Sequence, residues 1–340
     1  MREPGFWYRP ASWKSRSLRP LAALYGAVAG HRLKRKGLQA GIPVLCVGNY
    51  HGGGAGKTPT VLALAGVLRE LGETPVVLTR GYRGRLKGPV RVDAARHSAA
   101  DVGDEPLMLS QSLPVVVSRD RADGVALAKS LAATVILMDD GFQNPAVAKD
   151  ASLIVIDSVR GIGNAQVMPS GPLRAPLAAQ IERTDALIVI GTGNAADTVA
   201  GAIIAQDKPV LRARFLPEQA SLVALRGKRV LAFAGIGDPG RFYATLREAG
   251  VDVADTRVFG DHHPLTADEA ASLVAQAERD GLTLVTTEKD MARLRNPNGL
   301  PDWARAIVPF KVTLEFDDAP ALRTFVSAKL SKARERKRTA

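Results

Sequence analysis

A glycine-rich loop, GNYHGGGAGKTP, spans residues 48–59 and ends with a lysine and a threonine before Pro59. Glycines let successive backbone N–H groups turn towards phosphate oxygens, and the N-terminus of a following helix adds a positive field. In such a loop Lys57 reaches the terminal phosphates, and the Thr58 hydroxyl is a ligand for Mg²⁺. The residues expected to bind a nucleotide are His51, Gly52, Gly53, Gly54, Ala55, Gly56, Lys57 and Thr58.

The loop departs from the usual pattern G-x-x-x-x-G-K-[ST] at its first position, where this chain has His51. That position only begins the turn, so a side chain fits there if its backbone angles are ordinary. An apolar strand is predicted before the loop at 42–49, and a helix after it at 57–72. This is the context that a phosphate-binding loop requires. A flexible loop without a ligand is the alternative.

Two adjacent carboxylates, Asp139 and Asp140, follow an apolar run in TVILMDDGFQ, residues 134–143. The carboxyl ends of parallel strands form the crevice where ligands bind in α/β proteins. We therefore expect one of these aspartates to hold Mg²⁺, directly or through water. A helix-capping pair is the alternative.

A third acidic group, Asp104 with Glu105, lies in DVGDEP at 101–106, just ahead of a helical stretch. The pair is suited to supply a base for a substrate hydroxyl and a further metal contact. On spacing alone, an N-terminal helix cap is the better interpretation.

Arg80 and Tyr82 belong to TRGYRGR, residues 79–85, at the end of another predicted strand. Clustered guanidinium groups there favour an anionic substrate group, and a solvated loop fits the spacing equally well.

The second half of the chain contains GIGDPG at 235–240 and FGDHHP at 259–264. The first satisfies G-x-G-x-x-G between a strand and a helix, but this pattern alone is a weak dinucleotide signal. The second contains His262 and His263, with no cysteine or further histidine nearby to complete a zinc site. We interpret it as a histidine that pairs with a carboxylate at a domain interface, with a structural role as the alternative.

The net charge of +12 is concentrated at the two ends of the 340-residue chain. Residues 1–36 carry nine Lys or Arg against one acid, and residues 329–340 carry six against one. The remainder has 31 basic and 32 acidic residues, which argues against a nucleic-acid-binding body. The single cysteine, Cys46, excludes an internal disulfide framework and fits a reducing compartment.

The N-terminal charges flank an apolar stretch, LAALYGAVAG at 21–30, and accompany the aromatic PGFWYRPASW at 4–13. This combination favours a segment that lies on an anionic lipid surface. It is too short to span a bilayer, which needs about 20 apolar residues. A secretory signal and an ordinary helix packed on its own domain are the alternatives.

Short apolar runs alternate with helical patterns, which predicts an α/β fold with a parallel sheet of the phosphate-loop type. From about residue 220 the pattern restarts in a smaller unit. We predict a membrane-associating helical segment at 1–40, a core domain at 41–218, a smaller α/β domain at 219–328 and a basic tail at 329–340. Within the tail, KARERKRTA at 332–340 is interpreted as solvated and disordered.

Taken together, these stretches resemble the tetraacyldisaccharide 4'-kinases, the lipid A pathway kinases of Gram-negative bacteria. The resemblance covers nearly the whole chain. Beyond the glycine-rich loop, it rests on LTRGYRG, GDEPLML, DDGFQ, PSGPLRAPL, AFAGIGDPGRF, FGDHH and TTEKD.

The resemblance implies ATP- and Mg²⁺-dependent phosphorylation of the 4'-hydroxyl of a tetraacylated glucosamine disaccharide. It implies that Asp104 acts with His262, that Glu105, Thr58, Asp139 and Asp140 serve Mg²⁺ and the phosphates, and that Arg174 contacts the acceptor. The chain departs from the family pattern at Ala175, where an acid is usual, and at Asn144, where a histidine is usual.

The implied partners are the lipid A disaccharide precursor and anionic lipids at the cytoplasmic face of the inner membrane. No nucleic acid and no obligate protein partner are expected. A phosphate-loop GTPase or metallochaperone remains the alternative, although it needs a guanine-reading Asn-Lys-x-Asp stretch that this sequence lacks.

Overall fold

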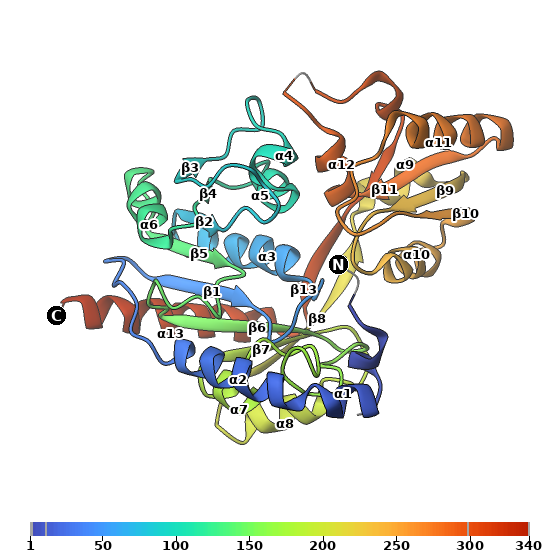
Figure 1. Cartoon of the computed structure of the whole chain (residues 1–340). Coiled ribbons are helices and arrows are strands. Elements are labelled where there is room, and N and C mark those ends of the chain that lie inside the picture. Colours follow the sequence, from blue (N-terminus) through green and yellow to red (C-terminus); the bar gives the residue numbers. More distant parts are fainter. Residues whose placement is uncertain (1–2, 11, 298, 339–340) are drawn as a thin grey trace.

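The computed structural model describes residues 3–10, 12–297 and 299–338, and these form two β-sheets with their helices (Figure 1). The larger sheet has the strand order β13-β8-β7-β6-β1-β5-β2-β4-β3, and the smaller has the order β10-β9-β11-β12. In Figure 1 the smaller sheet lies to the upper right of the larger one. The predicted α/β architecture, a parallel core with a second and smaller α/β unit, is confirmed.

The central strands of the large sheet are parallel and fully buried. They are β1 (Val44–Gly48), β2 (Pro75–Thr79), β5 (Val135–Asp139), β6 (Ala151–Asp157) and β7 (Ala186–Ile190). Because helices cover both faces, these strands are continuous apolar runs rather than alternating ones. Outside them lie β4 (Val115–Val117) and β8 (Val210–Pro217), with β3 (Val90–Arg91) and β13 (Val312–Phe316) as antiparallel edges.

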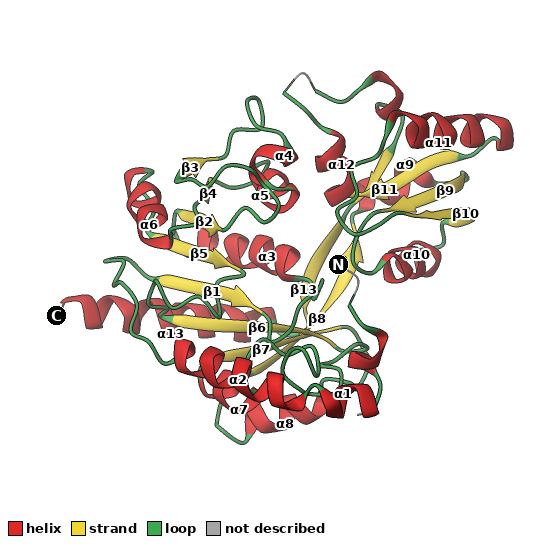
Figure 2. Ribbon diagram, viewed as in Figure 1, coloured by secondary structure: helices red, strands yellow, loops and turns green. Residues whose placement is uncertain are grey.

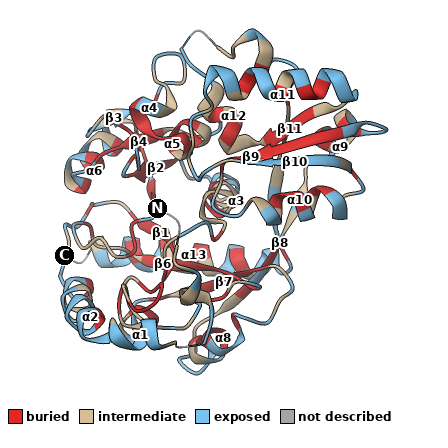
Figure 3. Cartoon of the chain, turned by 45° about the vertical axis from the view of Figure 1, so that its right-hand side comes forward, coloured by how far each residue is buried: buried red, intermediate tan, exposed pale blue. Residues whose placement is uncertain are grey.

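Helices from different parts of the chain cover the two faces of the large sheet. One face packs against α3 (Lys57–Glu70), α4 (Ala99–Val102), α5 (Asp104–Leu109) and α13 (Ala319–Arg338). The other packs against α6 (Arg121–Ser130), α7 (Leu177–Glu182) and α8 (Asp197–Ile204). Each interface is a buried apolar cluster, visible as the buried interior in Figure 3.

The smaller unit is built on four parallel strands. These are β9 (Arg229–Ala234), β10 (Asp252–Val258), β11 (Thr283–Thr287) and β12 (Val308–Phe310). Its helices are α9 (Gln219–Leu225), α10 (Pro239–Glu248), α11 (Ala267–Asp280), α12 (Glu288–Leu294) and the 3₁₀ turn η2 (Asp302–Ala304). The predicted restart of the strand–helix pattern near residue 220 corresponds to this unit.

The chain ends on the large sheet, not in the smaller unit. β13 pairs with β8, and α13, which extends to Arg338, packs on the sheet through Leu322, Val326 and Leu330. The prediction that 332–340 is disordered is therefore wrong for residues 332–338, which are helical, while residues 339–340 lie outside the described residues. The basic residues are anchored because Lys329 pairs with Asp185, and Arg334 lies 2.7 Å from Glu73, while apolar residues of the same helix are buried. The domain boundaries at 218 and 328 remain predictions.

The N-terminal segment is helical, as expected. It contains the 3₁₀ turn η1 (Gly5–Tyr8), α1 (Trp13–Ser17) and α2 (Arg19–Leu33), and α2 lies beside α7 (Figure 2). Gly26 of α2 faces Pro176, the residue before α7, and a Cβ at Gly26 would lie 3.5 Å from the Pro176 side chain, an ordinary van der Waals contact. The helices in the described part of the chain include none long and apolar enough to cross a membrane.

Candidate active site

The glycine-rich loop connects β1 to α3, as the sequence predicts. Gly53 and Gly56 have φ angles of 91° and 90°, a region that favours glycine. A Cβ at Gly56 would lie 2.6 Å from Ile190 Cδ1, so a larger residue there would displace the Ile190 side chain in addition to straining the backbone. The N-terminus of α3 follows at Lys57, which creates an anion-binding site of backbone N–H groups and a positive helix end.

His51 is fully buried. Its ring Nδ1 contacts the carbonyl oxygen of Gly52, and its Nε2 is buried without a partner among the described residues. Burial, with smaller effects of Lys57 and Arg174, lowers the pKa of His51 to about 4. The imidazole is therefore neutral at physiological pH. The expected contact of His51 with nucleotide stays a prediction, because its side chain lies inside the protein.

Two residues that the sequence did not single out lie against the loop. A Cβ at Gly53 would lie 3.0 Å from Glu3 Oε1 and 3.1 Å from Arg160 Nη1. Arg160 pairs with Glu3 and lies over the Tyr8 ring at 4.2 Å. No sequence spacing indicates this contact, because the partners are 157 residues apart in the chain.

Asp139 and Asp140 have different environments at the end of β5. Asp140 accepts a hydrogen bond from Arg174 Nη1 at 2.8 Å and lies 3.8 Å from Lys57 Nζ. Partial desolvation opposes ionisation of this carboxylate, but Lys57 and Arg174 hold the pKa of Asp140 well below its usual range. Asp140 is therefore neutralised by two cations, whereas Asp139 forms no ion pair with the residues that the structure describes.

Asp139 is buried, and its Oδ1 has no hydrogen-bond partner in the described part of the chain. Burial, with the nearby charges of Glu105 and Asp140, raises the pKa of Asp139 to about 7. A buried carboxylate oxygen without a donor is a suitable ligand for a hard cation.

The oxygen donors of Asp139, Glu105 and Thr58 fit Mg²⁺. Across the residues that the structure describes, no group of three or more His, Cys, Asp or Glu could hold a metal by itself. Mg²⁺ takes oxygen ligands and commonly binds through one or two protein carboxylates together with substrate phosphates.

Asp104 and His262 meet across the space between the two units. His262 Nδ1 lies 2.8 Å from Asp104 Oδ2, so the hydrogen bond expected at the domain interface is present. Burial opposes ionisation of Asp104. The hydrogen bond from His262 and the charges of Lys289 and Arg293 nevertheless lower the pKa of Asp104 far below its usual range. Glu105 extends the cluster, with Oε1 3.0 Å from Lys289 Nζ. The sequence did not identify Lys289 or Arg293.

The predicted acceptor-side residues lie in different positions. Arg174 donates a hydrogen bond to Asp140. The exposed Tyr82 ring packs edge-on against the His262 ring, with the ring centroids 5.7 Å apart. Arg80 is exposed at the end of β2. The neighbouring Arg83 donates to the carbonyl oxygen of Asp261 at 2.9 Å and thereby ties the two units together.

The segment 235–240 packs against the glycine-rich loop. A Cβ at Gly237 would lie 3.9 Å from the backbone nitrogen of Gly54. Just beyond it, Arg241 pairs with Asp157 and lies over the Phe215 ring at 4.6 Å. The G-x-G-x-x-G pattern thus marks a contact between the two units.

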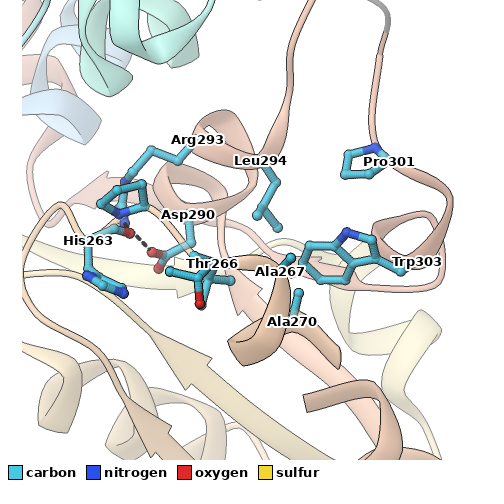
Figure 4. Close-up of a pocket in the computed structure, with 11 residues that line it drawn as sticks. His263, Thr266, Ala267, Ala270, Asp290, Arg293, Leu294, Pro301 and Trp303 are labelled. Atoms are coloured by element: carbon cyan, nitrogen blue, oxygen red, sulfur yellow. Dashed lines mark hydrogen bonds and ion pairs between the residues drawn. The ribbon is translucent and has the colours of Figure 1, made fainter. Parts of the chain in front are cut away.

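A cavity of about 210 Å³ lies in the smaller unit (Figure 4). His263, Asp290, Arg293 and Trp303 are among its lining residues, and none of the predicted site residues lines it. Its lining residues all belong to the smaller unit, and none of them comes from the glycine-rich loop.

Comparisons with known proteins agree with this geometry. Residues 14–331 match the family model described as "Tetraacyldisaccharide-1-P 4'-kinase". Proteins named tetraacyldisaccharide 4'-kinase from Nitrobacter winogradskyi and Bradyrhizobium diazoefficiens are 64% and 66% identical, covering 98% and 99% of this chain and 99% of each relative. A crystal structure of LpxK from Aquifex aeolicus in complex with ATP is similar with a TM-score of 0.72 and 25% identity, covering 93% of this chain and 99% of that one.

The raised pKa of Asp139 predicts that Asp139→Asn stabilises the fold. The folded protein holds this proton more tightly than the unfolded chain, whose ordinary value is 3.8, so ionisation costs stability. The cost is absent below the unfolded value, grows as pH rises, and is constant above about 7. We expect the Tm of Asp139→Asn to exceed that of the wild type by about 2 °C at pH 8 and not at pH 4.

Thermal unfolding of both proteins across this pH range checks the prediction. Asp317→Asn, at an exposed position, is the matched control and should change Tm at neither pH. An Asp139→Asn variant less stable than the wild type at pH 8 would contradict the assignment of a strained carboxylate.

Proposed function

The chain belongs to the tetraacyldisaccharide-1-P 4'-kinase family, and from this premise we propose how its residues perform the reaction. The reaction is transfer of the γ-phosphoryl group of ATP to the 4'-hydroxyl of a tetraacylated disaccharide in lipid A biosynthesis. Two contacts between the units support the assignment. The Asp104–His262 hydrogen bond joins them at 2.8 Å, and a Cβ at Gly237 would lie 3.9 Å from both Gly54 N of the glycine-rich loop and Oδ2 of Asp261, the residue before His262.

Phosphoryl transfer depends mainly on positioning and on neutralising charge. The loop amides and Lys57 bind the terminal phosphates of ATP, since they are the donors at the N-terminus of α3. Asp139, Glu105 and Thr58 would hold Mg²⁺, which when bound neutralises charge on the phosphate oxygens. Asp140, paired with Lys57 and Arg174, holds both cations in place.

The acceptor hydroxyl needs a group that takes its proton as oxygen bonds to phosphorus and the bond from the γ-phosphorus to ADP breaks. Asp104 supplies this group, because its lowered pKa keeps it ionised and His262 orients it by a 2.8 Å hydrogen bond. Tyr82 beside His262, Arg174 on Asp140, and the exposed Arg80 are proposed to contact the sugar or its phosphate.

The N-terminal segment is proposed to place the enzyme on anionic lipid at the cytoplasmic face of the inner membrane. The face of α2 opposite α7 exposes Leu21, Leu24, Tyr25 and Val28, which recur at helical spacing. Trp13 is 74% exposed just before them. An apolar stripe flanked by arginines suits an interfacial helix, in which each nearby Lys or Arg contributes about 1 kcal/mol on anionic lipid.

The reaction is tested by incubating the full chain with labelled ATP, Mg²⁺ and the tetraacylated disaccharide 1-phosphate, followed by identification of the product. A 4'-phosphorylated lipid is expected. Label transfer to water alone, or activity that depends on GTP, would contradict the proposal.

Asp104→Ala is predicted to lower kcat by about 10²–10⁴-fold, because the hydroxyl proton loses its acceptor. Nucleotide affinity, measured by titration with a non-hydrolysable ATP analogue, should stay unchanged, since the glycine-rich loop is intact. Asp317→Asn serves again as the control. Retained turnover in Asp104→Ala would remove Asp104 from the role of base.

Leu24→Asp combined with Val28→Asp is predicted to weaken binding to anionic vesicles and to raise KM for acceptor presented in vesicles. Two charges on the stripe oppose its burial in lipid. Turnover with detergent-dispersed acceptor should be preserved. Val223→Asp, at a 58% exposed position in the smaller unit, is the control for surface charge. Unchanged vesicle binding in the double variant would contradict the assigned lipid surface.

A further inference from the structure

Asp104 is held from the opposite unit. Among the described residues, the side chains that contact its carboxylate come from the smaller unit: His262 Nδ1 at 2.8 Å and Arg293 Nε at 3.0 Å, with Lys289 Nζ at 4.0 Å. All three approach the same oxygen, Oδ2. The other oxygen, Oδ1, accepts the backbone N–H of Glu105 at 3.1 Å. Helix α12, which carries Arg293, lies beside α5, which carries Asp104 (Figure 1).

Arg293 is itself fixed by its own unit. Its Nη1 lies 2.8 Å from Asp290 Oδ1, a contact that Figure 4 shows as a dashed line. Its Nη1 and Nη2 also donate to the carbonyl oxygens of His263 at 3.2 Å and Gly235 at 2.9 Å. Every guanidinium nitrogen is therefore engaged, which leaves Nε aimed at Asp104 with little rotational freedom.

The two units have other ties that do not involve Asp104. Arg83 donates to the carbonyl oxygen of Asp261, and Arg241 pairs with Asp157. The contact of Arg293 with Asp104 is thus not required simply to keep the units together. What distinguishes it is that Arg293 and His262 share one carboxylate oxygen.

We propose that Arg293 is a positioning residue for phosphoryl transfer, which sets the Asp104–His262 pair when the two units come together. With Oδ2 filled by Arg293 and His262, Oδ1 is the oxygen that remains for the acceptor hydroxyl. Without Arg293 the carboxylate rotates, and His262 loses the fixed acceptor for its Nδ1 proton. This inference rests on the function proposed above for Asp104, which Arg293 serves without touching the substrate.

Arg293→Ala and Arg293→Lys test the proposal in the full chain. For Arg293→Ala we expect kcat to fall by about 10²-fold, the loss typical of a misplaced reacting group, with KM for ATP unchanged. The kcat of Arg293→Lys should lie between those of Arg293→Ala and the wild type, because lysine keeps the charge and loses the planar guanidinium group. Arg279→Ala, which removes an exposed pair with Asp280 in the same unit, is the matched control.

The cavity beside Arg293 permits a sharper experiment (Figure 4). Removing the side chain opens its position to this 210 Å³ space, which can admit a small cation. Millimolar guanidinium chloride should restore part of the kcat of Arg293→Ala with saturation. It should not restore Asp104→Ala, and equal sodium chloride should have no such effect. A residue needed only for folding would not be replaced by a free ion.

A second readout does not depend on turnover. In protein labelled with ¹⁵N-histidine, the His262 signal of the wild type should report a proton on Nδ1 and none on Nε2. Arg293→Ala should average the two tautomers, at unchanged nucleotide affinity. The His262 signal is assigned as the one that is missing from the spectrum of His262→Gln. If the wild type shows no kinase activity, the proposed function fails, while the tautomer measurement still tests whether Arg293 positions the pair.

Two results would overturn the inference. One is a kcat of Arg293→Ala or Arg293→Lys within about twofold of the wild type. The other is an unchanged His262 tautomer in Arg293→Ala. If Arg293→Ala does not fold, Arg293→Lys decides the question through the kcat and the histidine signal.

Discussion

The arrangement of the site depends on one carboxylate oxygen, Oδ2 of Asp104, which lies in the core and is bonded by the smaller unit. Asp104 is 4% exposed, and an ionised carboxylate buried to that degree is stable only with donors around it. His262 and Arg293 provide those donors from across the interface. The Asp104 carboxylate therefore acquires its donors His262 and Arg293 only when the two units associate. A kinase gains from this coupling, because an incomplete site does not release the phosphoryl group to water.

The need of an ionised carboxylate for donors or cations around it also distinguishes the two aspartates at the end of β5. Adjacent residues in the chain point into different surroundings, so Asp140 has Lys57 and Arg174 as partners while Asp139 has a buried oxygen without one. The first is satisfied within the protein. We propose that a bound cation satisfies the second, and unsatisfied buried groups of this kind are typical of binding sites. On this proposal, two identical side chains acquire a structural and a ligand-directed role through their environments.

Local patterns were predictable, and contacts between distant segments were not. The β1–loop–α3 unit follows from a short stretch whose glycines, lysine and flanking apolar runs all lie within about one supersecondary motif. Spacing alone favoured a helix cap for Asp104, and its pairing with His262 was expected only from the resemblance. Arg293, 189 residues away, carried no signal, because nothing local distinguishes it from other arginines. The tail at 332–338 was misjudged for a related reason, since its charges looked solvated until their acidic partners were placed.

The orientation that we propose for the enzyme on a membrane would follow from how its N-terminal segment is attached. Trp7 Nε1 donates to the carbonyl oxygen of Pro169 at 3.0 Å, Gly26 lies against Pro176, and Glu3 pairs with Arg160 beside the glycine-rich loop. A segment held at several points moves with the core and not as a loose tether. Lipid bound to the apolar stripe of α2 would then fix the direction in which the loop and the Asp104–His262 pair face. Because the acceptor is itself anchored in the bilayer, restricting the approach to one direction lowers the orientational cost of bringing the sugar hydroxyl to the phosphate.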